Sequence, residues 1–182
     1  MKKGLLLFLL SIVLLACKNE QTQITKTSSQ GVEDIIKELK VKIKFKSTKA
    51  DNFKLMLNNI VKDEFQTKNI HIIEKVIVNT EMETLNANFG ENISNKLIIN
   101  FGNKEVKTID FESIDIYYGS NSINILPNQL RKFFNLNKFI SLDETSYFLQ
   151  TKKIEGKHNP SIILKQSAIN ILTGKKKATV KK

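Results

Sequence analysis

Apolar and polar residues alternate with a period of two along much of the chain. The clearest case is the segment 39–46, in which Leu39, Val41, Ile43 and Phe45 alternate with lysines. Successive side chains of a strand point to opposite faces, so this alternation predicts a strand with one buried and one solvated face.

Further short segments rich in Ile, Val, Phe and Tyr follow, separated by Gly, Asn and Ser. After a polar turn at 47–52, the segment 53–57 is favoured as a strand, although Phe53, Leu57 and Ile60 also fit one face of a helix. The other predicted strands are 70–78, 85–89, 96–101, 107–111, 113–118, 122–126, 139–142, 146–149 and 161–164.

Two short helices interrupt the strands. Pro127 opens a helical segment at 129–134, and a second segment at 167–172 is stopped by Gly174. The long helices that connect parallel strands are missing from the pattern. We therefore predict a mainly β fold, an antiparallel β-sandwich of jelly-roll type with one or two short helices.

The N-terminal residues form a pattern of their own. Lys2 and Lys3 precede an apolar run at 5–15, which is too short to cross a bilayer of about 30 Å as a stable helix and is typical of an export signal. Residues 14–17, Leu-Leu-Ala-Cys, resemble the lipobox of bacterial lipoproteins. The resemblance implies cleavage before Cys17 and a lipid on its sulfur. The alternative is an ordinary signal peptide in which this cysteine is incidental.

Four segments result from these patterns. We predict a signal peptide at 1–16, a lipidated cysteine with a flexible polar tether at 17–30, a β-sandwich domain at 31–172 and a lysine-rich tail at 173–182. The lipid would hold the protein to a membrane of the cell envelope, on the periplasmic or the cell-surface side.

The chain is basic, with 29 Lys and Arg against 18 Asp and Glu and a formal net charge of +11. Nearly all of the basic residues are lysines, and Arg131 is the sole arginine. This composition indicates a solvated, lysine-rich exterior more than a nucleic-acid site, and we predict no nucleic-acid partner.

Few residues offer catalytic or metal chemistry. Cys17 is the one cysteine of the chain, and if lipid occupies its sulfur, the protein can form no internal disulfide, thiolate metal site or cysteine nucleophile. His71 and His158 are far apart, and we interpret both as surface or rim residues. Asp110 and Glu112 would share a strand face, but they fit ordinary amphipathic alternation. We predict no enzyme activity, no cofactor and no metal.

Several segments together resemble a known module. Residues 97–102, 114–119 and 133–137, followed by 158–160, are similar to a β-sandwich module of Bacteroidetes envelope proteins, often attached to membrane proteins of surface-glycan metabolism. The resemblance would span about 38–165. It implies a jelly-roll fold like that of carbohydrate modules and carries over no catalytic residue. Asn100 stands where that module would have an acidic residue.

Sugar recognition on such sandwiches uses exposed aromatic rings with amide partners. Tyr117, Tyr118 and Asn121 are the candidate ligand-binding residues, because alternation turns one of two adjacent tyrosines outward. We therefore expect a noncatalytic binding module whose preferred partner is a glycan or polysaccharide. The alternative is an accessory lipoprotein that binds another envelope protein through a sheet edge or an apolar patch.

Overall fold

The computed structural model describes residues 36–175. The predicted signal peptide at 1–16, Cys17 with its tether at 17–30, and residues 176–182 of the predicted tail lie outside these residues. None of the helices within 36–175 is long and apolar enough to cross a membrane.

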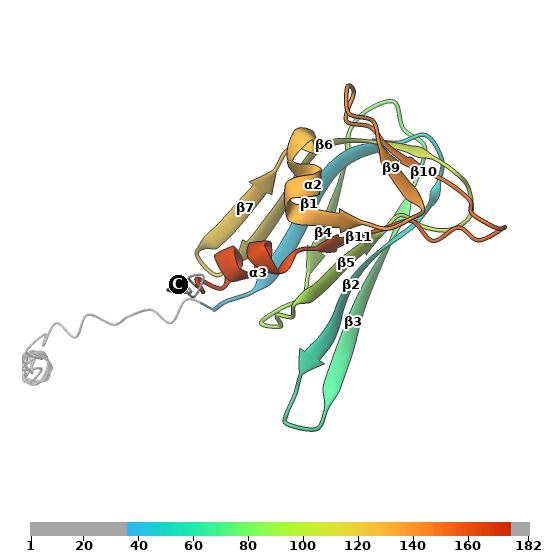
Figure 1. Cartoon of the computed structure of the whole chain (residues 1–182). Helices are drawn as coiled ribbons and strands as arrows, with labels where there is room; N and C mark the ends of the chain where they lie inside the picture. Colours follow the sequence, from blue (N-terminus) through green and yellow to red (C-terminus); the bar gives the residue numbers. More distant parts are fainter. Residues whose placement is uncertain (1–35, 176–182) are drawn as a thin grey trace, which may run out of the picture. The chain divides into compact units, whose positions relative to one another are not determined.

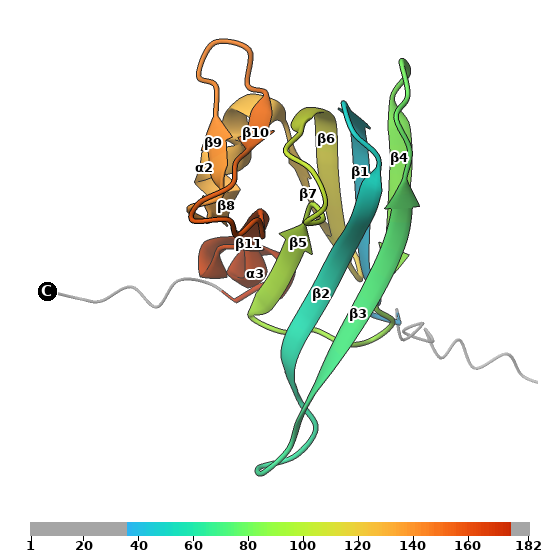
Figure 2. The ribbon, with the colours of Figure 1, turned by 90° about the vertical axis from the view of Figure 1, so that its right-hand side faces the viewer.

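Two antiparallel sheets face each other, which confirms the predicted β-sandwich (Figures 1 and 2). Sheet A contains, in order, β4 (Glu83–Asn88), β1 (Leu39–Ser47), β6 (Thr108–Tyr118), β10 (Leu149–Thr151) and β9 (Ile140–Leu142), with β7 (Asn121–Ile125) also paired to β6. Sheet B contains β3 (Thr67–Val76), β2 (Asp51–Val61), β5 (Lys96–Asn100), β11 (Ser161–Leu164) and β8 (Phe134–Leu136).

The strand orders of the two sheets correspond position by position. β4 continues β3, β1 leads into β2, β5 leads into β6, β10 leads into β11 and β8 leads into β9. The sandwich is therefore one antiparallel sheet bent over along a single line, which we call the fold line. The chain crosses this line at 48–50, 77–82, 101–107, 137–139 and 152–160.

Backbone hydrogen bonds join neighbouring segments of the chain at the fold line. The Thr48 amide donates to the carbonyl of Thr108 (3.1 Å), and the Thr151 amide donates to the carbonyl of Lys107 (2.9 Å). Neighbouring crossings are thus held side by side, so the bend is an ordered part of the sheet.

The core lies between the inner faces of the sheets, and aromatic rings fill it near the fold line. Phe45 and Phe53 stack with ring centroids 5.2 Å apart, and Phe101 packs edge-on against Phe53 (5.3 Å) and against Phe111 (5.7 Å). These residues are at most 3% exposed. Each such side chain contributes about 1.5–3 kcal/mol by leaving water.

Two short helices pack on the sandwich, as predicted. The turn η2 (Pro127–Gln129) leads into α2 (Leu130–Phe133), and α3 (Gln166–Leu172) buries Ala168 and Leu172. Gly174 follows α3 with a φ of 68°, a conformation that suits glycine at a helix end.

One strand replaces two predicted ones. The segments 107–111 and 113–118 are a single strand, β6, with a bulge: Phe45 lies opposite Phe111, whereas Lys44 lies opposite Ser113. The extra residue, Glu112, resets the alternation so that Ile114 and Ile116 still point inward.

Other predicted boundaries were wrong. Residues 146–148 of the predicted strand 146–149 are not a strand, because residues 143–148 form a turn in which the Asp143 carboxylate accepts hydrogen bonds from the Thr145 and Ser146 amides. The strand β10 begins only at Leu149. The helical alternative for residues 53–61 was also wrong, since β2 pairs on both sides. β8 was not predicted.

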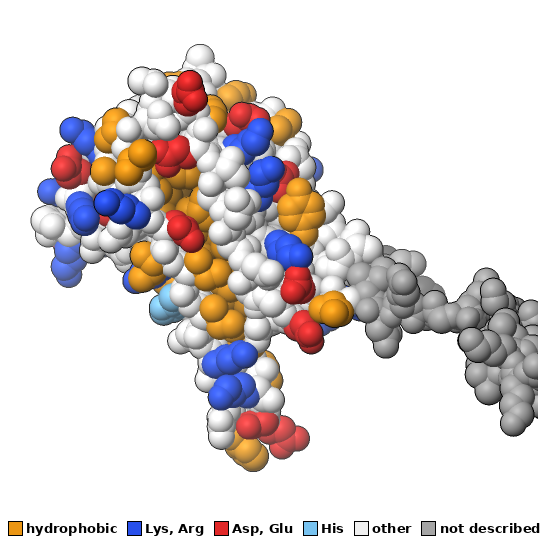
Figure 3. Space-filling view, turned by 180° about the vertical axis from the view of Figure 1, so that it is seen from behind, with side chains coloured by type: hydrophobic (Ala, Val, Ile, Leu, Met, Phe, Trp, Pro, Cys, Tyr) orange, Lys and Arg blue, Asp and Glu red, His pale blue; other side chains and the backbone are white. Residues whose placement is uncertain are grey.

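The β2–β3 hairpin extends beyond the rest of the sandwich (Figures 1 and 3). β2 pairs with β5 only as far as Asn58, whereas its pairing with β3 continues to Val61. The last residues of the hairpin therefore have no neighbouring strand on the other side of β2 within the described residues.

Candidate functional site

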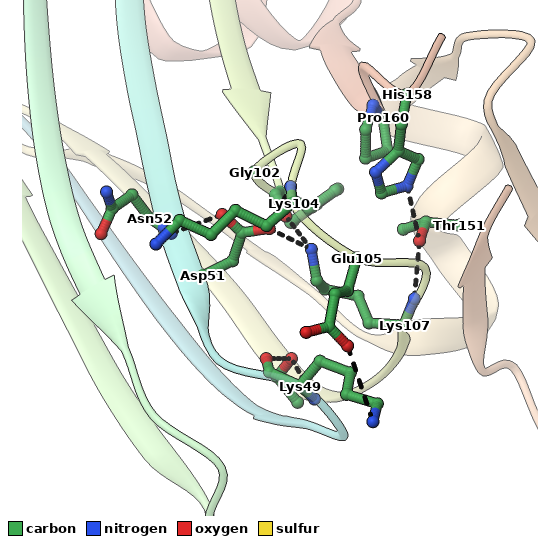
Figure 4. A network of polar contacts seen from close by, with 12 residues as sticks. Lys49, Asp51, Asn52, Gly102, Lys104, Glu105, Lys107, Thr151, His158 and Pro160 are labelled. Carbon is green, nitrogen blue, oxygen red and sulfur yellow. Dashed lines mark hydrogen bonds and ion pairs between the residues drawn. The ribbon is translucent and has the colours of Figure 1, made fainter. Parts of the chain in front are cut away.

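A buried polar cluster lies at the fold line (Figure 4). Lys107 Nζ is 2.6 Å from an Asp51 carboxylate oxygen, and both side chains are at most 1% exposed. Lys107 Nζ also donates to the carbonyl of Phe101 (3.0 Å), while the amides of Asn52 (2.8 Å) and Lys104 (3.0 Å) donate to Asp51. Asp51 was predicted in a polar turn, but it is the buried first residue of β2.

The surroundings of Asp51 keep its carboxylate ionised. Burial by itself raises the pKa of Asp51, but hydrogen bonds from Lys107 and from the backbone amides of Asn52 and Lys104 outweigh it, so the pKa lies below the ordinary value of 3.8. The ion pair is therefore fully formed at neutral pH.

Gly102 is required beside this pair. A Cβ on Gly102 would lie 2.1 Å from Asp51 Cγ, and the φ of Gly102 is 78°, in the left-handed region. No other residue fits without moving the carboxylate. In the sequence Gly102 looks like an ordinary turn residue, because its packing partner is distant along the chain.

His158 belongs to the same region, and its prediction as a surface residue was wrong. It is 8% exposed, and its Nε2 lies 3.0 Å from Thr151 Oγ1. The same hydroxyl accepts a hydrogen bond from the Lys107 amide (2.8 Å). His158 thus holds the 152–160 crossing to the end of β10, and the Thr151 hydroxyl in turn is bonded to the 101–107 crossing. His71 is exposed, as predicted, with its Nε2 3.1 Å from Asn58 Oδ1.

The buried cluster has a structural role and does not bind a ligand. Its ammonium and carboxylate groups are excluded from solvent and use their hydrogen bonds on each other, on the 101–107 crossing and on the Asn52 amide of β2. A substrate has no route to them in this arrangement, so surface residues are the better candidates for binding.

Of the two predicted tyrosines, Tyr117 is the one that faces outward. It is 42% exposed on sheet A and lines a shallow groove of about 250 Å³ together with Lys40, Lys42, Asn86 and Asn88. Tyr118 is partly buried and packs against the core.

The structure does not bring Asn121 to this groove. Its side-chain amide donates to the carbonyl of Leu172 (2.9 Å), which ties β7 to the end of α3. Ser122, not Asn121, lies opposite Tyr117 in the β6–β7 register. Tyr117 is therefore the only member of the predicted trio in the groove.

Asp110 and Glu112, the carboxylates considered for acid–base chemistry, make different contacts. Glu112 forms an exposed ion pair with Lys44 (2.9 Å). Asp110 instead lines an open hollow of about 490 Å³ over the fold line, which it shares with Asn79 and Phe148. The two carboxylates therefore do not form one cleft with each other.

Sequence reasoning missed a group of exposed apolar residues on and beside the β2–β3 hairpin. Val61, Phe65, Ile73, Ile77 and Val78 are all more than half exposed. In the space-filling view, hydrophobic side chains lie at the hairpin tip and again, above a group of Lys side chains, as a band with acidic residues beside it (Figure 3). In the sequence, Ile73, Ile77 and Val78 stand in apolar runs that look like buried strand residues.

The tip of the hairpin is an ordered turn. The Asp63 carboxylate accepts hydrogen bonds from the amides of Phe65 (2.8 Å) and Gln66 (2.9 Å), and the Lys62 amide donates to the carbonyl of Gln66 (2.9 Å). This turn presents Phe65 with 92% of its surface exposed.

β3 and β4 are the free strands at one edge of the sandwich, since each pairs with a single strand among the described residues. A cleft of about 270 Å³ opens between them. Phe45, Val76 and Leu85 line it with buried apolar surface, and Glu74 and Glu83 line it from the two edge strands.

No protein-family model matches the chain, and no curated protein matches it significantly. Within residues 36–175, no three His, Cys, Asp or Glu side chains gather as a metal site would require. The geometry of the surface therefore remains as the guide to function.

Proposed function

We propose that this protein is a noncatalytic component of the cell envelope, anchored by lipid at Cys17, that binds a second envelope protein through the β2–β3 hairpin and the free edge of β3. The observation that supports binding is the gathering of exposed Val61, Phe65 and Ile73 on this one hairpin. Val61 and Phe65 lie at the tip of the hairpin and Ile73 lies farther along β3, opposite Lys54. Exposed apolar surface that gathers on one element is found at interaction sites. The anchor is tested by mass spectrometry of the native protein, in which an unmodified Cys17 thiol would overturn it.

Phe65 has the properties of an interface anchor. Burying this side chain in a partner's pocket would contribute about 1.5–3 kcal/mol. The hydrogen bonds of Asp63 already fix the turn, so binding would cost less conformational entropy than ordering a loose loop.

The edge of β3 offers a second kind of contact. A strand with one neighbour leaves a row of backbone N–H and C=O groups unpaired, and an added strand can pair with them. Ile73 projects from the outer face at the middle of this edge, opposite Lys54 of β2. A partner could therefore contact the hairpin tip and the strand edge together.

Glycan binding at the Tyr117 groove is the second candidate function. An exposed tyrosine beside the amides of Asn86 and Asn88 supports it, because sugar rings stack on aromatic faces while amides bond hydroxyl groups. It ranks second because Tyr117 is the sole aromatic residue that lines this groove. A glycan array probed with residues 18–182 and with the Tyr117→Ser variant tests it.

Site-specific photo-crosslinking tests the first candidate. A photoreactive amino acid is placed at Ile73 in the full chain expressed in its native cells, and at Ile171 of α3 as a control with a similar exposed fraction (57% and 54%). We expect a discrete polypeptide adduct from position 73 alone. The same adducts from both positions, or no adduct from position 73, would overturn the proposal.

A further inference from the structure

The cleft between β3 and β4 holds two inward-pointing carboxylates. Glu74 lies opposite Phe53 in the β2–β3 register, and Glu83 lies opposite Phe45 in the β1–β4 register. Directly opposed residues of a sheet share a face, and both phenylalanines point into the core. Both glutamates therefore lie on the inner faces of the two edge strands, where Glu83 is partly buried and Glu74 is exposed at the mouth of the cleft.

These carboxylates lack cationic partners within residues 36–175. Neither Glu74 nor Glu83 takes part in an ion pair there, and Glu83 Oε1 is buried without a hydrogen-bond partner. A buried carboxylate oxygen left unpaired costs free energy that a donor would recover. Lys75 also lines the cleft, but it lies opposite Asn52 and projects from the outer face.

The shape of the cleft suits an extended chain. Free strand edges border it on both sides, and the nearly buried Val76 and Leu85 lie at its base beneath a mainly polar lining. An added strand would place alternate side chains toward this base, where one basic side chain could reach the glutamates.

We infer that this cleft binds an extended segment of the partner protein that pairs with the β3 edge and places a lysine or arginine between Glu74 and Glu83. This inference rests on the proposed function and names the chemistry of the segment that is bound. The carboxylates supply the selectivity, because they would repel an acidic strand and would stay unpaired beside a wholly apolar one.

The same two residues argue against a second copy of this chain as the occupant. If β3 of another copy paired at this edge, its own Glu74 would enter a region that is already acidic. Charged residues that point inward from edge strands are a recognised means of preventing such self-pairing. A basic strand from another protein meets no such repulsion.

Synthetic peptides test the inference with the purified soluble chain, residues 18–182. The probes are a peptide in which threonine alternates with valine around a central lysine, and the same peptide with central norleucine. Fluorescence anisotropy measures Kd for the wild type, for Glu74→Gln and Glu83→Gln, and for Glu64→Gln at the exposed hairpin tip as the matched control.

We expect the lysine peptide to bind the wild type and the Glu64→Gln variant about tenfold or more tightly than the norleucine peptide. Either cleft variant should abolish this preference while keeping the wild-type circular dichroism spectrum. Equal binding of both peptides, or a preference that survives in both cleft variants, would overturn the inference. Absence of peptide binding together with a crosslink from position 73 would reject the inference and leave the proposed function standing.

Discussion

The Asp51 carboxylate and the Lys107 ammonium lie 2.6 Å apart and are shielded from solvent, with Asp51 at the start of β2 and Lys107 at the end of the 101–107 crossing. Gly102 makes room for the carboxylate, and Thr151 joins the next crossing to the Lys107 amide. At the residue scale, this cluster joins neighbouring segments of the chain at the place where the sheet bends. The sequence could not predict it, because Asp51 looked like a turn residue and Lys107 like one surface lysine among many.

Removing the ammonium group should destabilise the protein strongly. We expect Lys107→Met to lower the free energy of unfolding by about 3–5 kcal/mol, because it leaves the buried Asp51 carboxylate without its cation. Lys49→Met is the matched control, since its 3.6 Å pair with Glu105 is exposed and should contribute less than about 1 kcal/mol. Urea denaturation measures both, and equal losses would contradict the structural role given to Lys107.

The Asp51 pKa predicts a pH dependence. Because its folded-state pKa lies below 3.8, its stabilising contribution is complete above that value and is lost as the pH falls through the folded-state pKa. The wild type should therefore exceed Asp51→Asn in unfolding free energy by a margin that is constant near neutral pH and shrinks in acid. A margin that grows as the pH falls would show that the pKa is raised instead.

At the scale of elements, the sequence predicted most strands and both helices, because alternation and turn residues are local signals. It missed the bulge at Glu112, which is visible only once Phe111 and Ser113 are paired with β1. It also placed a strand at 146–149, where the local hydrogen bonds of Asp143 favour a turn. These errors arise where pairing partners or side-chain capping override the local pattern.

Asn121 provides a test at this scale. Its bond to the Leu172 carbonyl fastens β7 to α3, so Asn121→Ala should lower the free energy of unfolding by about 1 kcal/mol. Tyr117→Ser, on the exposed groove of the same sheet, should change it by less than about 0.5 kcal/mol. Thermal unfolding compares the two, and an unchanged stability for Asn121→Ala would return this residue to the ligand-binding candidates.

At the scale of the molecule, the β-sandwich was predictable and its open edge was not. The alternation of Leu39 to Phe45 indicates that one face is buried, but it does not say which strands become neighbours. Only the strand order shows that β3 and β4 end their sheets side by side, with Glu74 and Glu83 between them. The predicted exposure of one tyrosine was correct, whereas the exposed hairpin that supports the proposed function depends on contacts across the whole fold.

Hydrogen–deuterium exchange tests the central claim most directly, by comparing the native protein in its membrane fraction with the purified soluble chain. We expect slower exchange in the membrane fraction for peptides from β3 and β4, at 67–76 and 83–88, and no change for β6 and β7 at 113–125. Protection confined to 113–125, where Tyr117 lies, or the absence of protection at β3 would contradict docking through this edge.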